Sequence, residues 1–162
     1  MIHIKDNVFH LKTATTSYVL KINEFKKLEQ CYYGLLIEDS DLRALGIPWI
    51  MEVGSNVHYS KDIKPSSMDL MLLECPEPQM GDYRHIPLNI WVNGLQLSDL
   101  KFVSHQLTTV DDYSLPRARE PHQTLSITLE DEILKVLVHL NYLVYEDSDV
   151  IETIKETLKD KE

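Results

Sequence analysis

Alternation of apolar and polar residues is the clearest pattern in the first quarter of the chain. Between residues 16 and 22, Tyr18, Leu20 and Ile22 occupy every second position. A period of two is typical of a strand with one buried face. Residues 30–37 are rich in aromatic and branched side chains, and Gly34 disfavours a helix there. The two segments are therefore predicted to pair as neighbouring strands of a meander.

Residues 38–87 lack this alternation. Each proline removes a backbone N–H and biases the residue before it towards extended geometry, so long strands and helices are disfavoured where prolines gather. Five of the seven prolines lie here: Pro48, Pro65, Pro76, Pro78 and Pro87. We expect a long connection dominated by loops, in which residues 70–73 could form one buried strand. Connections of this length are usually functional excursions or packed surface loops.

A β-hairpin is predicted where Asn93-Gly94 separates the apolar segments 88–92 and 95–97. Asn-Gly supplies the two positive φ angles of a type I′ turn, whose twist matches that of paired strands. An extended run continues from Leu100 to about Val110. A polar hinge that contains Pro116 and Pro121 follows it.

Two long strands are predicted after the hinge, and a helix after them. Apolar residues alternate with polar ones over 125–130. From Leu134 to Val144 every second residue is apolar, and the positions between them are partly apolar, which is typical of a strand covered on both faces. In the tail, Ile151, Ile154 and Leu158 recur at helical spacing, and Asp149 with Glu152 resembles a capping box. The prediction is an all-β protein, an antiparallel β-sandwich over residues 1–150, with a short C-terminal helix over 151–162.

Composition narrows the function classes. The chain has 16 Lys and Arg against 26 Asp and Glu, a net charge of −10, so nucleic acid and anionic membranes are unfavourable partners. Its apolar runs are far shorter than the roughly 20 residues of a membrane-spanning helix. Its start does not resemble a signal peptide. We expect a cytoplasmic protein in which Cys31 and Cys75 are reduced and serve as small apolar side chains.

The familiar catalytic motifs are absent from the sequence: it contains no GxSxG, Walker loop, HExxH, CxxC or GxGxxG. Its seven histidines form no helical i, i+4 pair. We therefore expect no cofactor and no metal site. Most carboxylate clusters are interpreted as solvated turns. Asp39 and Asp41, two residues apart at the start of the long connection, are the pair that this explanation fits least well.

Two other features permit either a structural or a binding role. Trp49 and Trp91 could stack on a sugar ring, but packing is the favoured interpretation for both. Trp49 is the stronger binding candidate because it lies in the loop region. Asp82 and Arg84 point the same way in an extended segment, so they could bind a polar ligand. Anchoring the long loop is the favoured role.

Several runs resemble the amino-terminal domain of the retaining α-galactosidases of glycoside hydrolase family 36. They are TSYVLKI (16–22), YYG (32–34), GDYR (81–84), LKFVSHQ (100–106), and TLSITLEDE followed by LVYEDSDVI, in order from residue 1 to about 151. The resemblance implies a large β-sandwich domain that precedes a catalytic (β/α)₈ barrel. The barrel with both catalytic aspartates is not in this sequence, so the chain alone is expected to be inactive. The family continues past residue 151 as a strand, whereas these residues have the helical pattern described above.

The resemblance also implies partners and site residues. The substrate would be an α-galactoside bound by the barrel, and the protein would be a homo-oligomer in which the loop after YYG reaches a neighbour's active site. Asp41 and Trp49 are the candidate substrate-binding residues in that loop. Apolar surface that a barrel would cover is expected to be exposed and to favour self-association. A free-standing carbohydrate-binding or protein-interaction module, or a small enzyme, are the alternatives.

Overall fold

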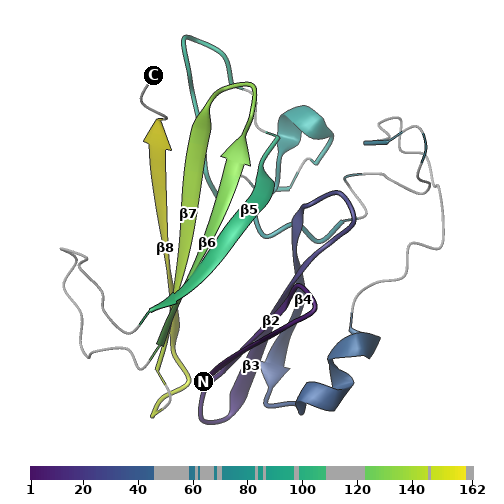
Figure 1. The fold of residues 1–162 in the computed structure, drawn as a ribbon, viewed down its shortest axis with the longest axis vertical. Coiled ribbons are helices and arrows are strands. Elements are labelled where there is room, and N and C mark those ends of the chain that lie inside the picture. The colour runs from purple at the N-terminus through teal and green to yellow at the C-terminus, as the bar shows by residue number, and fades with distance from the viewer. Residues whose placement is uncertain are drawn as a thin grey trace.

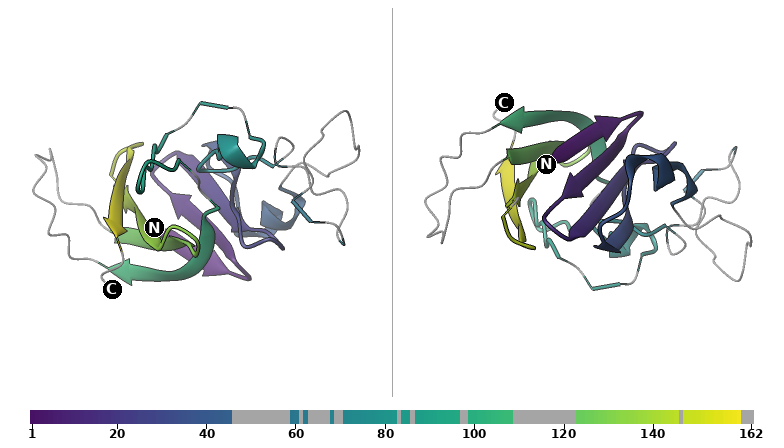
Figure 2. Two further views of the ribbon diagram at one scale, coloured as in Figure 1. Left: turned by 90° about the horizontal axis from the view of Figure 1, so that it is seen from above. Right: turned by 90° about the horizontal axis from the view of Figure 1, so that it is seen from below.

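The computed structural model describes residues 1–45, 59–60, 62, 68, 71–82, 84–85, 87–96, 99–108, 123–145 and 147–159. Within these residues two four-stranded antiparallel sheets pack as two layers, the first purple to blue and the second green to yellow (Figures 1 and 2). Strands that are neighbours in sequence are neighbours in each sheet. The predicted antiparallel β-sandwich is confirmed.

The first sheet is a meander. Its strands are β1 (Ile2–Lys5), β2 (Val8–Lys12), β3 (Thr16–Ile22) and β4 (Leu28–Leu35). The pattern predicted β3 and β4 but not β1 and β2, which have four and five residues. The turn that joins β1 to β2 uses Asp6 and Asn7 with φ of 50° and 63°, the left-handed geometry that closes a tight hairpin.

The second sheet consists of β5 (Lys101–Thr108), β6 (Gln123–Asp131), β7 (Val136–Val144) and β8 (Ile151–Lys159). Residues of β6 and β7 whose side chains point into the core are paired across the two strands, with Leu125 opposite Tyr142 and Ile127 opposite Leu140. A bulge in β5 shifts its register between Phe102 and Ser104. The strands predicted over 125–130 and 134–144 are confirmed as β6 and β7, and the extended run predicted from Leu100 is confirmed as β5.

The predicted C-terminal helix is wrong. Residues 151–159 form β8, which pairs with β7 from Val144 opposite Ile151 to Val136 opposite Lys159. The free edge of β7 offers this segment a full ladder of backbone hydrogen bonds, whereas an isolated helix of this length is marginal in water. Four of its nine residues are also β-branched, which favours a strand.

The core lies between the two sheets. Phe9 and Leu20 contribute from the first sheet and Leu140 and Tyr142 from the second, and each is fully buried. The sheets are also joined by backbone, because the Phe102 N–H donates to the Lys26 carbonyl at 2.8 Å. The remaining buried apolar residues of the strands in this cluster are Ile2, Leu11, Ile22, Leu28, Leu125, Ile127, Leu129, Val136, Val138 and Val144.

The described residues of the connection between β4 and β5 have little regular structure, as predicted. Its described residues form two short 3₁₀ helices, η1 (Asp39–Ala44) and η3 (Pro78–Met80). Instead of a full strand at 70–73, Leu73 makes one bridge to Glu29. Hydrogen bonds from the N–H of Gln30 to the Leu72 carbonyl and from the N–H of Glu74 to the Leu28 carbonyl extend that contact. Leu70 itself lies outside the described residues.

The Asn93-Gly94 turn is present, but its hairpin is short. Both residues have positive φ, and Val92 and Leu95 exchange two 2.9 Å hydrogen bonds around them. Flanking residues do not continue the ladder within the part of the hairpin that the structure describes. The packing role predicted for Trp91 is wrong, since 61% of this residue is exposed. It lies on the side of the short hairpin that faces solvent, whereas Ile90 beside it is buried.

Candidate functional site

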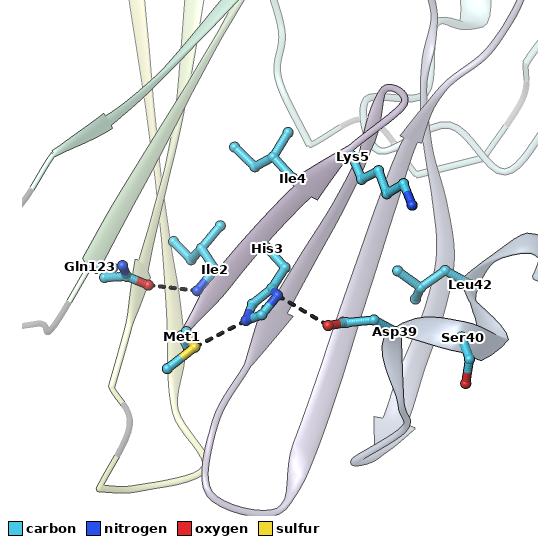
Figure 3. A pocket seen from close by; sticks show the side chains of 9 residues that line it. All are labelled: Met1, Ile2, His3, Ile4, Lys5, Asp39, Ser40, Leu42 and Gln123. Atoms are coloured by element: carbon cyan, nitrogen blue, oxygen red, sulfur yellow. Dashed lines mark hydrogen bonds and ion pairs between the residues drawn. The ribbon is translucent and has the colours of Figure 1, made fainter.

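The segment that follows β4 folds back over the outer face of the first sheet and places η1 there. The Leu36 N–H donates to the Thr15 carbonyl at 2.7 Å, and the Ile37 N–H donates to Ser17 Oγ at 3.1 Å. The helix η1 then begins at Asp39 (Figure 3). Its N-cap residue, Glu38, makes no side-chain capping bond. The position of η1 therefore depends on contacts made by other residues.

Asp39 supplies those contacts. Its Oδ1 lies 2.8 Å from Lys12 Nζ and 2.7 Å from His10 Nδ1, and its Oδ2 lies 3.0 Å from His3 Nδ1. The hydrogen bond from Lys12 is the main reason why the pKa of Asp39 is lowered, with His10 adding to the effect. Asp39 is thus an ionised carboxylate that ties the first residue of η1 to β1 and β2.

His10 is fully buried and links this carboxylate to β3. Its Nε2 lies 2.8 Å from Ser17 Oγ. Burial lowers the pKa of His10, and the hydrogen bond to Asp39 opposes that effect only in part. Neutral His10 can donate from Nδ1 to Asp39 and accept at Nε2 from the Ser17 hydroxyl. That hydroxyl oxygen in turn accepts the Ile37 N–H. Each hydrogen in this series of hydrogen bonds therefore has an acceptor.

The order serine, histidine, aspartate matches that of a hydrolase triad, but the arrangement cannot act as one. Ser17 is fully buried within β3. Its oxygen already accepts the Ile37 N–H and its proton is directed to His10. A nucleophile needs room for a substrate carbon at its oxygen. The three residues therefore hold η1 in place and do no chemistry on a substrate.

A hollow of about 700 Å³ lies beside this cluster, along β1 (Figure 3). His3 stands between Met1 and Asp39 on one side of the strand, while Ile2 and Ile4 point to the other side. Gln123, at the start of β6, accepts the Ile2 N–H at 2.6 Å. The hollow is lined by Met1, Ile2, His3, Ile4, Lys5, Asp39, Ser40, Leu42 and Gln123.

The two predicted substrate-binding residues differ in what the structure says of them. Asp41 lies within η1, two residues after Asp39. Trp49 lies outside the described residues. Asp39, the other half of the acidic pair, is engaged by three neighbouring side chains. Its carboxylate is an anchor for η1 and cannot at the same time be half of a glycosidase pair in this chain.

The anchoring role predicted for Asp82 and Arg84 is confirmed. Arg84 Nε and Nη2 lie 2.8 and 2.6 Å from the two carboxylate oxygens of Asp82, and Nη2 also donates to the Met71 carbonyl. Asp82 is fully buried. The pair joins Asp82 and Arg84 to Met71, close to the segment that bridges β4.

Sequence reasoning missed His3, His10, Lys12 and Ser17 as the residues that hold η1. One signal was available for His10, which stands between Phe9 and Leu11 in an apolar run. A histidine in such a run requires buried hydrogen-bond partners. Those partners, Ser17 and Asp39, come from two other elements, β3 and η1, and no local pattern identifies them.

The described residues also bear on metal sites and on membrane-spanning helices. No group of three or more His, Cys, Asp or Glu residues there is placed to hold a metal ion. Among the same residues, none of the helices is long and apolar enough to cross a membrane. Cys31 and Cys75 are both free thiols, and burial raises their pKa to about 11 and about 12.

Comparison with known proteins identifies the class to which this sandwich belongs. Residues 26–160 match the model of the glycosyl hydrolase family 36 N-terminal domain. The chain is 33% identical over 159 residues to a bifunctional α-galactosidase/sucrose kinase, AgaSK, of Mediterraneibacter gnavus, a match that covers 89% of this chain and 16% of the relative. The chain belongs to the glycosyl hydrolase family 36 N-terminal domain family.

Solved structures agree with this assignment. The GH36 α-galactosidase AgaB from Geobacillus stearothermophilus superposes with a TM-score of 0.83 at 21% identity, over 98% of this chain and 22% of that one. A variant of α-galactosidase AgaA from the same organism, in complex with raffinose, gives 0.82 at 26% identity over 94% of this chain and 22% of that one. The chain thus spans about a fifth of these proteins and corresponds to their N-terminal domain. Their catalytic barrel is not part of this sequence.

Proposed function

We propose that this chain is the non-catalytic N-terminal β-sandwich domain of an α-galactosidase that acts on terminal α-galactosides. The family match over residues 26–160 is the observation that carries the proposal. The 33% identity to an α-galactosidase/sucrose kinase supports it. The domain serves as a rigid support for a barrel that carries the chemistry, and it does not hydrolyse a galactoside by itself.

We further propose that the enzyme is a cytoplasmic homo-oligomer in which η1 and the loop after it meet a neighbour's active site. Asp41 and Trp49 are the residues that would contact an α-galactoside there. Tyr33, Leu35 and Leu36, just before η1, are 63%, 77% and 46% exposed. Exposed apolar side chains gathered beside a tightly anchored helix favour a contact between subunits at this place. The two free thiols suit a reducing compartment.

Kinetics of the full-length enzyme that carries this domain test the role of Asp41. Asp41→Ala should raise KM for raffinose about tenfold, because a hydrogen bond to the sugar is lost, and should leave kcat within about twofold. Glu38→Gln, which neutralises an exposed carboxylate three residues earlier, is the matched control and should change neither value. An unchanged KM in Asp41→Ala refutes this role of η1.

The 162-residue chain alone tests the wider proposal. It should not release nitrophenol from a nitrophenyl α-galactoside, and turnover that follows the chain through purification contradicts the assignment. Sedimentation at increasing concentration should reveal self-association. Leu35→Ser in the exposed apolar group should reduce it, and a wild-type chain that stays monomeric counts against an oligomer built on this face.

A free-standing carbohydrate-binding module is the second candidate, and the exposed indole of Trp91 favours it. A flat aromatic face complements the apolar C–H face of a galactose ring. Titration of the isolated chain with galactose or melibiose, followed by Trp fluorescence, separates the two functions. Binding that is lost in Trp91→Ala supports the module, and no binding up to millimolar sugar supports the accessory domain.

A further inference from the structure

The anchor of η1 is a series of four hydrogen-bonding groups, and while His10 is neutral these groups take one arrangement of hydrogens. The Ile37 N–H donates to Ser17 Oγ at 3.1 Å, Ser17 Oγ lies 2.8 Å from His10 Nε2, and His10 Nδ1 lies 2.7 Å from Asp39 Oδ1. An ionised carboxylate can only accept, so the hydrogen of neutral His10 lies on Nδ1, and its bare Nε2 accepts the Ser17 hydroxyl, whose oxygen also accepts the Ile37 N–H.

This arrangement is sensitive to protonation of one residue. A second hydrogen on His10 would place a donor at Nε2, opposite the Ser17 hydroxyl. The hydroxyl hydrogen would then lose its acceptor in a fully buried position, and an unsatisfied buried donor is costly. The charged groups that face His10 are Asp39 from η1, Lys12 from its own strand and His3 from β1. Asp39 favours protonation, whereas Lys12 and His3 oppose it.

We propose that Ser17 and His10 are positioning residues for substrate binding, which hold η1 and Asp41 in place only while His10 is neutral. The inference rests on the proposed function of η1 at a neighbour's active site. Neither residue touches substrate. Their effect reaches Asp41 through Asp39, two residues earlier in the same helix.

The sign of the pH effect follows from the direction of the shift in His10. Its pKa lies below the ordinary value of 6.5, and burial is the largest cause, ahead of the opposite effect of Asp39. If release of η1 returns water to the imidazole, the larger of these two effects is removed, so the released state binds more protons and acid favours it. In the full-length enzyme, KM for raffinose should rise on acidification from pH 7 to pH 5 more steeply than in a variant without this histidine.

Substitutions of His10 in that enzyme test the proposal. His10→Ala should raise KM about tenfold at pH 7 with kcat within about twofold, because both links are lost. His10→Asn keeps a donor near Asp39 but cannot titrate, so it should recover part of the KM and lose the additional rise at pH 5. Ser17→Ala should behave as His10→Ala does. His139→Asn, at a histidine that contacts Thr128 at 3.0 Å in the second sheet, is the matched control.

Amide hydrogen exchange in the 162-residue chain separates loss of position from loss of fold. In His10→Ala the amides of residues 36–45 should exchange at least tenfold faster, while those of β6 and β7 stay protected. If β6 and β7 also lose protection, His10→Ala has disturbed the whole fold, and the KM of His10→Asn tests the proposal instead. A KM equal to that of wild type at both pH values overturns the proposal, and loss of the acid-dependent rise supports it.

The outcomes also separate this inference from the proposed function. If Asp41→Ala raises KM and the His10 and Ser17 variants do not, η1 meets substrate but this hydrogen-bond chain does not position it, and the inference falls alone. If Asp41→Ala leaves KM unchanged, the proposed role of η1 falls and takes the inference with it. If all three raise KM at pH 7 and the His10 variants lose the additional rise at pH 5, both stand.

Discussion

Two clusters of charged side chains hold the long connection onto the sandwich, and they differ in their access to water. At the Asp39 cluster, 43% of the carboxylate side chain is exposed. At the second cluster, the side chains of Lys27 and Glu77 are 1% and 2% exposed. Lys27 lies in the turn between β3 and β4, and its Nζ is 2.6 Å from Glu77, 2.7 Å from Asp99 and 3.0 Å from the Leu100 carbonyl.

The difference lies in what can replace a lost partner. Water can reach Asp39 when one of its three neighbours is removed, and the energy of an exposed ion pair is small. Lys27 has no such substitute, since the ring of Tyr59 lies 5.3 Å from its ammonium and Glu77 also accepts the Leu100 N–H at 3.0 Å. The buried cluster therefore contributes to stability, whereas the exposed one mainly sets the position of a surface helix.

Removing the buried cation should have the largest effect. Lys27→Met keeps the aliphatic stem but leaves Glu77 and Asp99 without their common partner, and unfolding free energy should fall by about 3–5 kcal/mol. Urea denaturation followed by tryptophan fluorescence measures the change. Lys101→Met is the control in the same network, since this lysine is 30% exposed and 3.2 Å from Asp99. An equal loss of unfolding free energy in Lys27→Met and Lys101→Met would contradict the distinction between buried and exposed charges.

The pH dependence of the buried cluster should be the next largest effect. Burial raises the pKa of Glu77 to about 7 from 4.5, against the attraction of Lys27. Between these values the folded state binds more protons than the unfolded state, so this group's contribution to stability falls as the pH rises. The unfolding free energy of wild type minus that of Glu77→Gln should therefore fall by about 2 kcal/mol from pH 5 to pH 7.5. Urea titrations at both pH values measure it, and a constant difference would refute the shift.

Ser17→Ala should have an intermediate effect on stability. The substitution removes the acceptor of the Ile37 N–H and the donor to His10, at a position without access to water. Unfolding free energy should fall by about 1–3 kcal/mol. Ser104→Ala, on the edge strand β5 where the side chain is exposed, is the control and should stay within about 0.5 kcal/mol of wild type. Thermal unfolding followed by circular dichroism gives both values.

Lys12→Met should have the smallest effect and is the direct counterpart of Lys27→Met. Lys12 is one of three neighbours of Asp39, and water replaces it at the exposed carboxylate. The expected loss is below about 1 kcal/mol and should shrink further in 0.5 M salt. Denaturation at low and high salt measures both. A loss as large as that of Lys27→Met would show that the Asp39 cluster is energetically a buried network.

Local patterns determined much of the sandwich but little of the candidate site. Alternation located β3, β6 and β7, because a strand with one buried face must repeat its apolar side chains every second residue. Aromatic and branched composition located β4. The Asn-Gly pair located its turn because few residues adopt two consecutive positive φ angles. The ordered runs from TSYVLKI to LVYEDSDVI identified the family, and Asp41 was placed in the segment that forms η1.

Tertiary structure alone decided the features that depend on partners far along the chain. Ile151, Ile154 and Leu158 fit a helix as well as a strand, and the free edge of β7 made residues 151–159 a strand. Lys27 looks like any turn lysine until residues 77 and 99 surround it, 50 and 72 positions away. The hydrogen bonds that link the Ile37 N–H through Ser17 and His10 to Asp39 connect three elements, β3, β2 and η1. Such groups are brought together by packing of the sheets, which depends on the summed burial of many residues and leaves no local pattern at any one of them.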